Sequence, residues 1–232
     1  GDGYELRLVK PEEISEVLTE DIAVAVITEV DYRTGRRHDM TDITAKAKEH
    51  GIKVIWDLCH CAGAFPVDLS GSGAELAVGC SYKYLNGGPG APAFLYVTPE
   101  LQNDIQPPLS GWMGHTAPFD FDLDYRPAEG ISRNLCGTPG VIAMSALDTA
   151  LDVWQDVDLH QVRQKSQKLL NQGIFKVIKY YLVLADEGFM NLIHLNILKN
   201  ILKYAQKLSH LVSKLCRGFL RKILRKFRDT RN

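Results

Sequence analysis

The apolar residues of the first 170 positions form short runs whose spacing predicts alternating strands and helices. Nearly continuous apolar runs are typical of strands buried on both faces of a sheet, whereas steps of three and four residues are typical of helices that cover it. The expected strands are residues 4–9, 22–30, 52–58, 74–80 and 93–97. One helix is expected to begin at residues 11–13. Three more are expected at residues 41–50, 141–154 and 160–170. This alternation predicts an α/β fold in which helices flank a mostly parallel sheet.

A different pattern fills the rest of the chain. Apolar side chains recur there at helical spacing, and basic side chains fill much of the remaining surface. Residues 173–232 carry a net charge of +10 and residues 1–172 a net charge of −11, and all 10 prolines precede residue 140. We therefore expect a first domain of residues 1–172, followed by a helical basic tail of residues 173–232.

Three interpretations of this basic tail remain open. Its apolar stripe packs on the acidic first domain, or it binds a membrane surface or partner helix, or it is out-of-frame sequence with no selected role. We favour the first interpretation. Nucleic-acid binding fits less well, because the charges are interleaved with leucine rather than with aromatic residues that stack on bases.

Composition narrows the class of protein. The chain has 232 residues, of which 45% are hydrophobic and 24% charged, which suits one large domain or two small ones. No apolar run reaches the roughly 18–20 residues that span a bilayer, and no signal peptide is recognised, so we expect a cytoplasmic protein. The five cysteines match no zinc spacing, so we expect reduced thiols and no bound metal.

Ionisable side chains stand at the ends of two strands that should be buried. Asp57 lies at the end of one run, and Lys83 follows the next. The carboxyl ends of parallel strands form the edge of a sheet where ligands bind. A lysine that forms a Schiff base and an aspartate that keeps a ring nitrogen protonated suit pyridoxal 5'-phosphate (PLP) chemistry. From these two residues alone, a surface lysine and a helix-capping aspartate remain the simpler explanation.

Longer strings around these two residues resemble one family of PLP enzymes, kynureninase. Residues 57–69 resemble its aspartate segment, and residues 78–94, which include Tyr-Lys-Tyr-Leu-Asn-Gly-Gly-Pro-Gly, resemble its Schiff-base segment. Residues 31–36 resemble the family's Tyr-Arg-Thr-Gly turn, and residues 111–115 and 135–138 resemble two of its later motifs. The motifs follow the family's order, and the resemblance covers roughly residues 1–170.

The resemblance implies a fold and a role for each matching residue. The implied fold is a partial large domain of the type I PLP transferases, which have the aspartate-aminotransferase fold. Lys83 would form the Schiff base and move the α-proton, and Asp57 would pair with the pyridine nitrogen. The other implied contacts are His60 beside the ring, Tyr82 at the phosphate and as a proton relay, and Trp112 and Thr138 at the phosphate of a neighbouring subunit. The implied assembly is a homodimer with shared active sites, and the alternative for each side chain is a packing role.

The implied reaction is hydrolysis of L-kynurenine or 3-hydroxykynurenine to anthranilate or 3-hydroxyanthranilate and L-alanine. This reaction belongs to tryptophan catabolism by the kynurenine pathway, which leads to NAD biosynthesis. No motif resembles the family's earlier phosphate-binding loop or its arginine for the substrate carboxylate, so we expect a fragment with impaired activity. Two alternatives stay open. One is an inactive remnant or binding protein that uses the basic helix. The other is a lyase like cysteine desulfurase, which normally has histidine where this chain has Tyr82.

Overall fold

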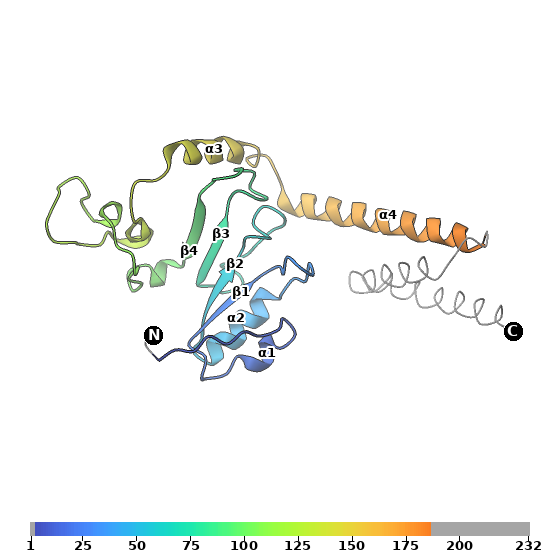
Figure 1. Cartoon of the computed structure of the whole chain (residues 1–232), viewed down its shortest axis with the longest axis horizontal. Helices are drawn as coiled ribbons and strands as arrows, with labels where there is room; N and C mark the ends of the chain where they lie inside the picture. Colours follow the sequence, from blue (N-terminus) through green and yellow to red (C-terminus); the bar gives the residue numbers. More distant parts are fainter. Residues whose placement is uncertain (1–2, 187–232) are drawn as a thin grey trace. The chain divides into compact units, whose positions relative to one another are not determined.

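This computed structural model describes residues 3–186. A four-stranded mixed sheet lies at the centre of the first part of the chain. The strands are β1 (Val24–Thr28), β2 (Lys53–Asp57), β3 (Leu76–Cys80) and β4 (Ala93–Val97). They lie side by side in chain order (Figure 1). The first three are parallel, and β4 runs antiparallel to β3. All four match strands predicted from the sequence, and helices flank the sheet, so the predicted α/β fold is confirmed.

The helices also follow the sequence pattern, with one difference in length. They are α1 (Ile14–Val17), α2 (Met40–Glu49), α3 (Val141–Asp152) and α4 (Leu159–Asp186), with short 3-10 segments η1 (Pro99–Leu101), η2 (Trp112–Gly114) and η3 (Gly130–Asn134). The helix expected to open at residues 11–13 begins one residue later, after a turn. The helix expected at residues 160–170 continues well beyond its predicted end as α4.

The strand predicted at residues 4–9 is wrong. This segment has no regular secondary structure. Its alternating apolar side chains Tyr4, Leu6 and Leu8 are 82%, 84% and 88% exposed. The period of two is that of a strand, but a strand also needs a neighbour to receive its backbone hydrogen bonds. None of the described strands pairs with this segment.

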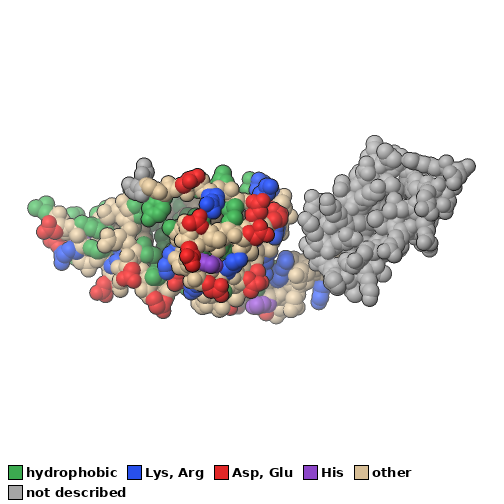
Figure 2. Space-filling view, turned by 90° about the horizontal axis from the view of Figure 1, so that it is seen from below, with side chains coloured by type: hydrophobic (Ala, Val, Ile, Leu, Met, Phe, Trp, Pro, Cys, Tyr) green, Lys and Arg blue, Asp and Glu red, His purple; other side chains and the backbone are tan. Residues whose placement is uncertain are grey.

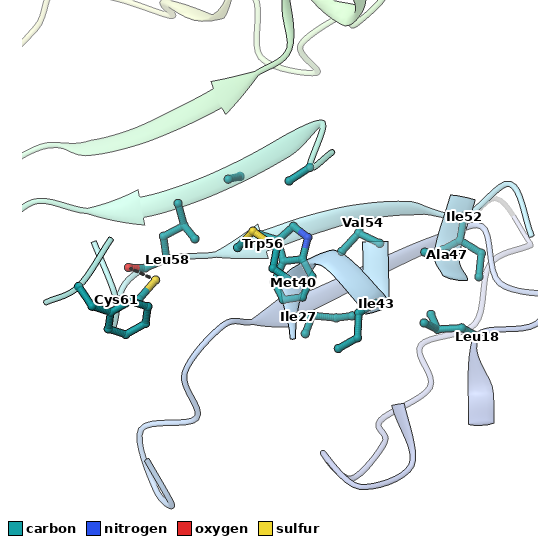
Figure 3. Packing of buried hydrophobic residues seen from close by; sticks show 13 residues of the cluster. Leu18, Ile27, Met40, Ile43, Ala47, Ile52, Val54, Trp56, Leu58 and Cys61 are labelled. Atoms are coloured by element: carbon teal, nitrogen blue, oxygen red, sulfur yellow. Dashed lines mark hydrogen bonds between the residues drawn. The ribbon is translucent and has the colours of Figure 1, made fainter. Parts of the chain in front are cut away.

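The hydrophobic core lies between α2 and one face of the sheet (Figure 3). The buried side chains of α2 are Met40, Ile43, Thr44 and Ala47, whose spacing places them on one face of the helix. Trp56 of β2 is fully buried beneath this helix face, and its indole Nε1 donates a hydrogen bond to Thr44 Oγ1 at 3.1 Å. This bond satisfies the one polar atom of the largest core side chain.

The opposite face of the sheet is open in the part of the chain that the structure describes. Successive residues of β1 show the difference, because Val26 is 70% exposed whereas Ile27 is 6% exposed. Val78 of β3 and Leu95 of β4, which are paired in the sheet, are also exposed. Since side chains of a strand alternate between faces, one side of this sheet is packed and the other is not.

The chain divides into two units, the first ending at Arg163 and the second beginning at Gln164. Helix α4 continues without interruption through the domain boundary expected between residues 172 and 173, so that boundary stays a prediction. Most of the predicted basic tail, residues 187–232, lies outside the described residues. Within the described residues, no helix is both long and apolar enough to cross a bilayer.

Candidate active site

The carboxyl ends of the three parallel strands lie level with one another. The backbone N–H of Glu29, just after β1, donates to the carbonyl of Asp57 at 3.0 Å. The N–H of Leu58, just after β2, donates to the carbonyl of Val78 at 2.8 Å. The segments that follow β1, β2 and β3 therefore begin at one edge of the sheet, the edge at which parallel sheets bind ligands.

Lys83 and His60 meet at this edge. Both side chains are partly buried, and Lys83 Nζ lies 2.8 Å from His60 Nε2. The two residues belong to different loops, because His60 follows β2 and Lys83 follows β3. The ring of Tyr82 also lies close to the amine, with its centroid 5.3 Å from Nζ. Three of the six predicted site residues are thus in direct contact.

Asp57 belongs to the same edge and is held by its own loop. Its Oδ1 accepts a hydrogen bond from the backbone N–H of Cys59 at 2.8 Å. The carbonyl of Cys59 in turn lies 3.8 Å from the Sγ of Cys80, the last residue of β3. A local hydrogen bond therefore fixes the carboxylate, and the thiol contact joins its loop to the strand that leads to Lys83.

A close backbone contact between Gly63 and Tyr84 joins the two loops a second time. Gly63 has a φ of +86°, and a Cβ placed on it would lie 2.7 Å from the carbonyl oxygen of Tyr84. A real Cβ does not approach a carbonyl oxygen that closely, and a positive φ strains other residues. Glycine at position 63 therefore allows the loop after Asp57 to pack directly on the loop that carries Lys83.

The loop that carries Lys83 is also closed on itself. Ser81, which is buried, accepts a hydrogen bond from the N–H of Gly87 on its carbonyl at 3.0 Å. Its hydroxyl donates to the carbonyl of Pro92 at 2.5 Å. The N–H of Asn86 donates to the carbonyl of Lys83 at 3.1 Å. These bonds fix the backbone on both sides of the lysine.

The surroundings change the acid–base properties of Lys83. Partial burial lowers its pKa, but the Tyr82 hydroxyl and the negative charges that Cys80, Tyr82 and Cys59 carry when ionised raise it, and the net pKa lies above its usual value. Lys83 is therefore an ammonium group at neutral pH. Because an ammonium has no acceptor, Lys83 Nζ donates its hydrogen bond and His60 Nε2 accepts it.

Nearby thiols are kept protonated. Burial, followed by Asp57 and Cys80, raises the pKa of Cys59 to about 12. Burial, followed by the carboxylate of Glu29, also raises the pKa of Cys61. A protonated thiol is a poor nucleophile, so we do not expect Cys59 or Cys61 to act as the nucleophile at this edge.

Trp112 and Thr138 lie on a separate, largely irregular segment. Trp112 is exposed and packs edge-to-face on Phe119, with ring centroids 5.6 Å apart. Thr138 is exposed as well. The backbone of Gly111 packs against the carbonyl of Cys136, so the structure brings their two segments together. Their predicted role at a cofactor phosphate stays a prediction.

The predicted site residues do not line the cavity that the structure shows near the end of β1. No group of three or more metal-ligating side chains occurs in the part of the chain that the structure describes. A cavity of about 470 Å³ is lined by Glu29, Arg37, His38 and other residues, and none of the six predicted site residues is among them. Glu29 is buried there and paired with Arg37 at 2.9 Å.

The contact between Tyr32 and His60 was not predicted from the sequence. The ring of Tyr32 stacks on the imidazole of His60, with centroids 5.6 Å apart and an interplanar angle of 26°. The sequence motif around residues 31–36 marks this segment as distinctive, but it does not indicate that Tyr32 reaches a side chain 28 positions later.

Comparison with known proteins places these features in a family context. The model of the aminotransferase class-V family matches residues 4–184. The kynureninase of Deinococcus radiodurans is 54% identical over 170 residues, which are 73% of this chain and 42% of that protein. The kynureninase of Burkholderia mallei is 49% identical over 167 residues, which are 72% of this chain and 40% of that protein. The chain therefore spans about two fifths of the length of these curated relatives.

Solved structures with the same fold agree with this match. A cysteine desulfurase from Thermococcus onnurineus NA1 superposes with a TM-score of 0.59 at 20% identity, covering 73% of this chain and 41% of that one. The cysteine desulfurase CsdA from Escherichia coli gives a TM-score of 0.58 at 22% identity, covering 72% of this chain and 41% of that one. At these identities the likeness concerns the fold alone.

Proposed function

This chain belongs to the aminotransferase class-V family, and from that premise we propose that it carries the Schiff-base lysine and the pyridine-binding aspartate of a kynureninase. The observation that carries the proposal is the contact of Lys83 with His60 at the strand edge that also holds Asp57. The identity of 54% to a kynureninase over 170 residues supports it.

The residues at this edge fit PLP, the cofactor on which the family depends. An amine, a carboxylate, an imidazole and a phenol gather where two loops meet, which is the donor and acceptor set that an aldehyde, a pyridine nitrogen and a phosphate need. PLP supplies an electron sink when it is bound. Lys83 would hold its aldehyde carbon, and Asp57 would keep its ring nitrogen protonated. His60 would lie beside the ring, and Tyr82 would bind the phosphate.

The proposed reaction is the hydrolysis of L-kynurenine or 3-hydroxykynurenine. The bond between the β-carbon and the aryl ketone carbon breaks, and the oxygen of water joins the ketone carbon to give the carboxylate of anthranilate or 3-hydroxyanthranilate. The β-carbon gains a proton and leaves in L-alanine. Lys83 is the group that would move the α-proton, and the phenol of Tyr82, which both donates and accepts, would relay a proton.

The proposed assembly is a homodimer in which Trp112 and Thr138 reach the neighbouring subunit's cofactor phosphate. The exposure of both residues and the packing of their segments on each other support this proposal. Four cysteines of the described chain are free thiols, which supports a reducing compartment such as the cytoplasm.

The first experiment asks whether PLP attaches to Lys83. The chain is incubated with PLP, reduced with borohydride to fix any Schiff base, digested, and examined by mass spectrometry. We expect the label on Lys83, loss of the label in Lys83→Ala, and no change in Lys165→Ala, which removes an exposed lysine of α4. Equal labelling of the native chain and Lys83→Ala would refute the assignment.

The second experiment separates the proposed activity from its alternatives. Kynurenine, 3-hydroxykynurenine and cysteine are each supplied to the PLP-loaded chain, and anthranilate fluorescence and sulfide release are measured. Slow anthranilate formation that is absent in Lys83→Ala is expected. Sulfide release without anthranilate would favour a desulfurase, and PLP attachment without either product would favour an inactive remnant.

A further inference from the structure

Tyr32 is an exposed aromatic residue with a defined contact. Its side chain is 72% exposed, so its ring adds little to the hydrophobic core. The one ring that it stacks on in the described structure is the imidazole of His60. A stacked ring covers one face of the imidazole and restricts its rotation about the side-chain bond.

The turn that presents Tyr32 is rigid. Its neighbour Asp31 is buried, and the two carboxylate oxygens of Asp31 accept hydrogen bonds from the N–H of Arg33 at 3.1 Å and the hydroxyl of Thr34 at 2.7 Å. The N–H of Gly35 donates to the carbonyl of Asp31 at 2.8 Å. The backbone on both sides of Tyr32 is therefore held, which fixes the point from which its ring reaches His60.

The contact with Lys83 selects one tautomer of the neutral imidazole of His60. Lys83 Nζ is an ammonium and donates to His60 Nε2, so the neutral imidazole carries its proton on Nδ1. An ammonium does not attack an aldehyde, because its lone pair is occupied by a proton. The Nε2 atom is the acceptor within hydrogen-bond distance of that proton.

We propose that Tyr32 is a positioning residue, whose ring holds His60 so that Nε2 receives the hydrogen bond of Lys83. The orientation and proton loss of the amine then depend on a residue that follows β1 and lies outside the cofactor contacts assigned above. This inference rests on the proposed function, because the benefit of an oriented amine is faster attachment of PLP.

The first test needs no cofactor. Nitrogen chemical shifts of the His60 imidazole report which ring nitrogen carries the proton, and the signal is assigned with His60→Gln. At alkaline pH, with the imidazole neutral and Lys83 still charged, we expect the Nδ1–H form in the native chain and in Tyr32→Phe. In Tyr32→Ala and Tyr32→Leu, which lack a stacking ring, we expect a mixture of the two tautomers.

The second test measures how fast PLP attaches to Lys83 by absorbance. Misplacement of a reacting group by about 1 Å costs up to about a hundredfold in rate, so we expect attachment to slow about tenfold in Tyr32→Ala and Tyr32→Leu. Tyr32→Phe should retain the native rate, because stacking does not need the hydroxyl. Tyr4→Ala removes another exposed tyrosine and serves as the control for surface effects.

The outcomes are decisive in both directions. A native tautomer in Tyr32→Ala and Tyr32→Leu, or native attachment rates in both, would overturn the positioning role. Loss of the tautomer in Tyr32→Phe would also overturn it, since the hydroxyl and not the stacked ring would then be responsible. Failure of the native chain to bind PLP would refute the proposed function, whereas the tautomer measurement would still decide whether Tyr32 orients His60.

Discussion

Asp57 accepts a local backbone hydrogen bond that does not require its negative charge. The backbone N–H of Cys59 donates to its Oδ1, and an asparagine at this position keeps an equivalent oxygen. The charge of Asp57 is therefore free to act on a ligand. A substitution by asparagine therefore removes the charge of residue 57 and keeps the hydrogen-bond acceptor.

Asp57→Asn is expected to weaken PLP binding without unfolding the chain. A neutral amide does not hold a proton on the pyridine nitrogen, and we expect about tenfold weaker binding, or about 1.4 kcal/mol, in an absorbance titration. Asp68→Asn is the matched control, because Asp68 accepts a similar local hydrogen bond from the N–H of Gly71 at 2.7 Å. Equal affinity in both variants would contradict the role of Asp57.

The pKa of Asp31 gives a prediction about pH. The Thr34 hydroxyl, followed by the N–H of Arg33, lowers the pKa of Asp31 below 3.8 against the opposing effect of burial. The ionised carboxylate therefore stabilises the native chain above the unfolded-state pKa, and this stability is lost as pH falls through the native pKa.

Thr34→Val should raise the pKa of Asp31 and move acid unfolding to higher pH, because the largest cause of the depression is removed. Carboxyl carbon chemical shifts and circular dichroism during acidification measure the two effects. Thr149→Val removes a hydroxyl that bonds to the backbone carbonyl of Ser145 and no carboxylate, so it should change neither. An unchanged Asp31 titration in Thr34→Val would show that the hydroxyl is not the cause.

At the scale of elements, the packing of one loop on another depends on Gly63. Gly63→Ala adds backbone strain at positive φ and a clash with the carbonyl oxygen of Tyr84. Gly51→Ala is the matched control, because Gly51 has a φ of +71° but no heavy atom lies within 4 Å of the position that an added Cβ would take. Each methyl costs about 1–2 kcal/mol for the left-handed backbone alone.

We expect urea unfolding to show a larger loss of stability for Gly63→Ala than for Gly51→Ala, by about 1–3 kcal/mol for the added overpacking. PLP should also attach to Lys83 more slowly in Gly63→Ala, since the clash separates the two loops of the site. Equal losses of stability in the two variants would mean that the two loops can move apart at Gly63 without destabilising the chain.

Elements with a strong period were predictable from the sequence. β1 is apolar except for its last residue, β2 has three apolar residues between two charged ones, and α2 repeats its buried residues at helical spacing. Residues 4–9 have the period of a strand, but no described strand pairs with them. Whether a segment finds a neighbouring strand depends on the assembled sheet and not on its own sequence. The length of α4 was underestimated, because Gly173 and the change in composition near it suggested an end that the helix does not have.

The site was predictable only in part. The positions of Asp57 and Lys83 after strands indicated a shared edge, and the contact of Lys83 with His60 agrees with that expectation. The stacking of Tyr32 on His60 and the approach of Gly63 to Tyr84 were not predictable, because each depends on how two loops lie in space. Local patterns predict elements, whereas contacts between loops need the assembled sheet.

At the scale of the whole molecule, one face of the sheet is packed and the other exposes apolar side chains, which bears on self-association. Acidic and basic side chains are interspersed over the surface of the first unit seen in Figure 2, whereas Val26, Val78 and Leu95 expose apolar surface on one side of the sheet. Large apolar side chains exposed to water on one face of a sheet favour self-association.

A pair of adjacent substitutions tests this difference between the faces. Val26→Thr should reduce self-association in sedimentation velocity and change stability by less than about 0.5 kcal/mol, as is usual for an exposed position. Ile27→Thr places a hydroxyl in the core and should cost about 1–3 kcal/mol in urea unfolding. Similar large losses for both variants would show that the Val26 face is covered in solution.

The strands of the sheet follow one another in space as they do in the sequence. His60 and Lys83 are consequently 23 positions apart, and a ribosome that adds about 5–20 residues each second delivers the second within about one to five seconds of the first. A nascent polypeptide can thus bring the loops that follow β2 and β3 together while the remainder is still being translated. If Lys83 holds PLP as proposed, this topology allows the cofactor to attach during synthesis.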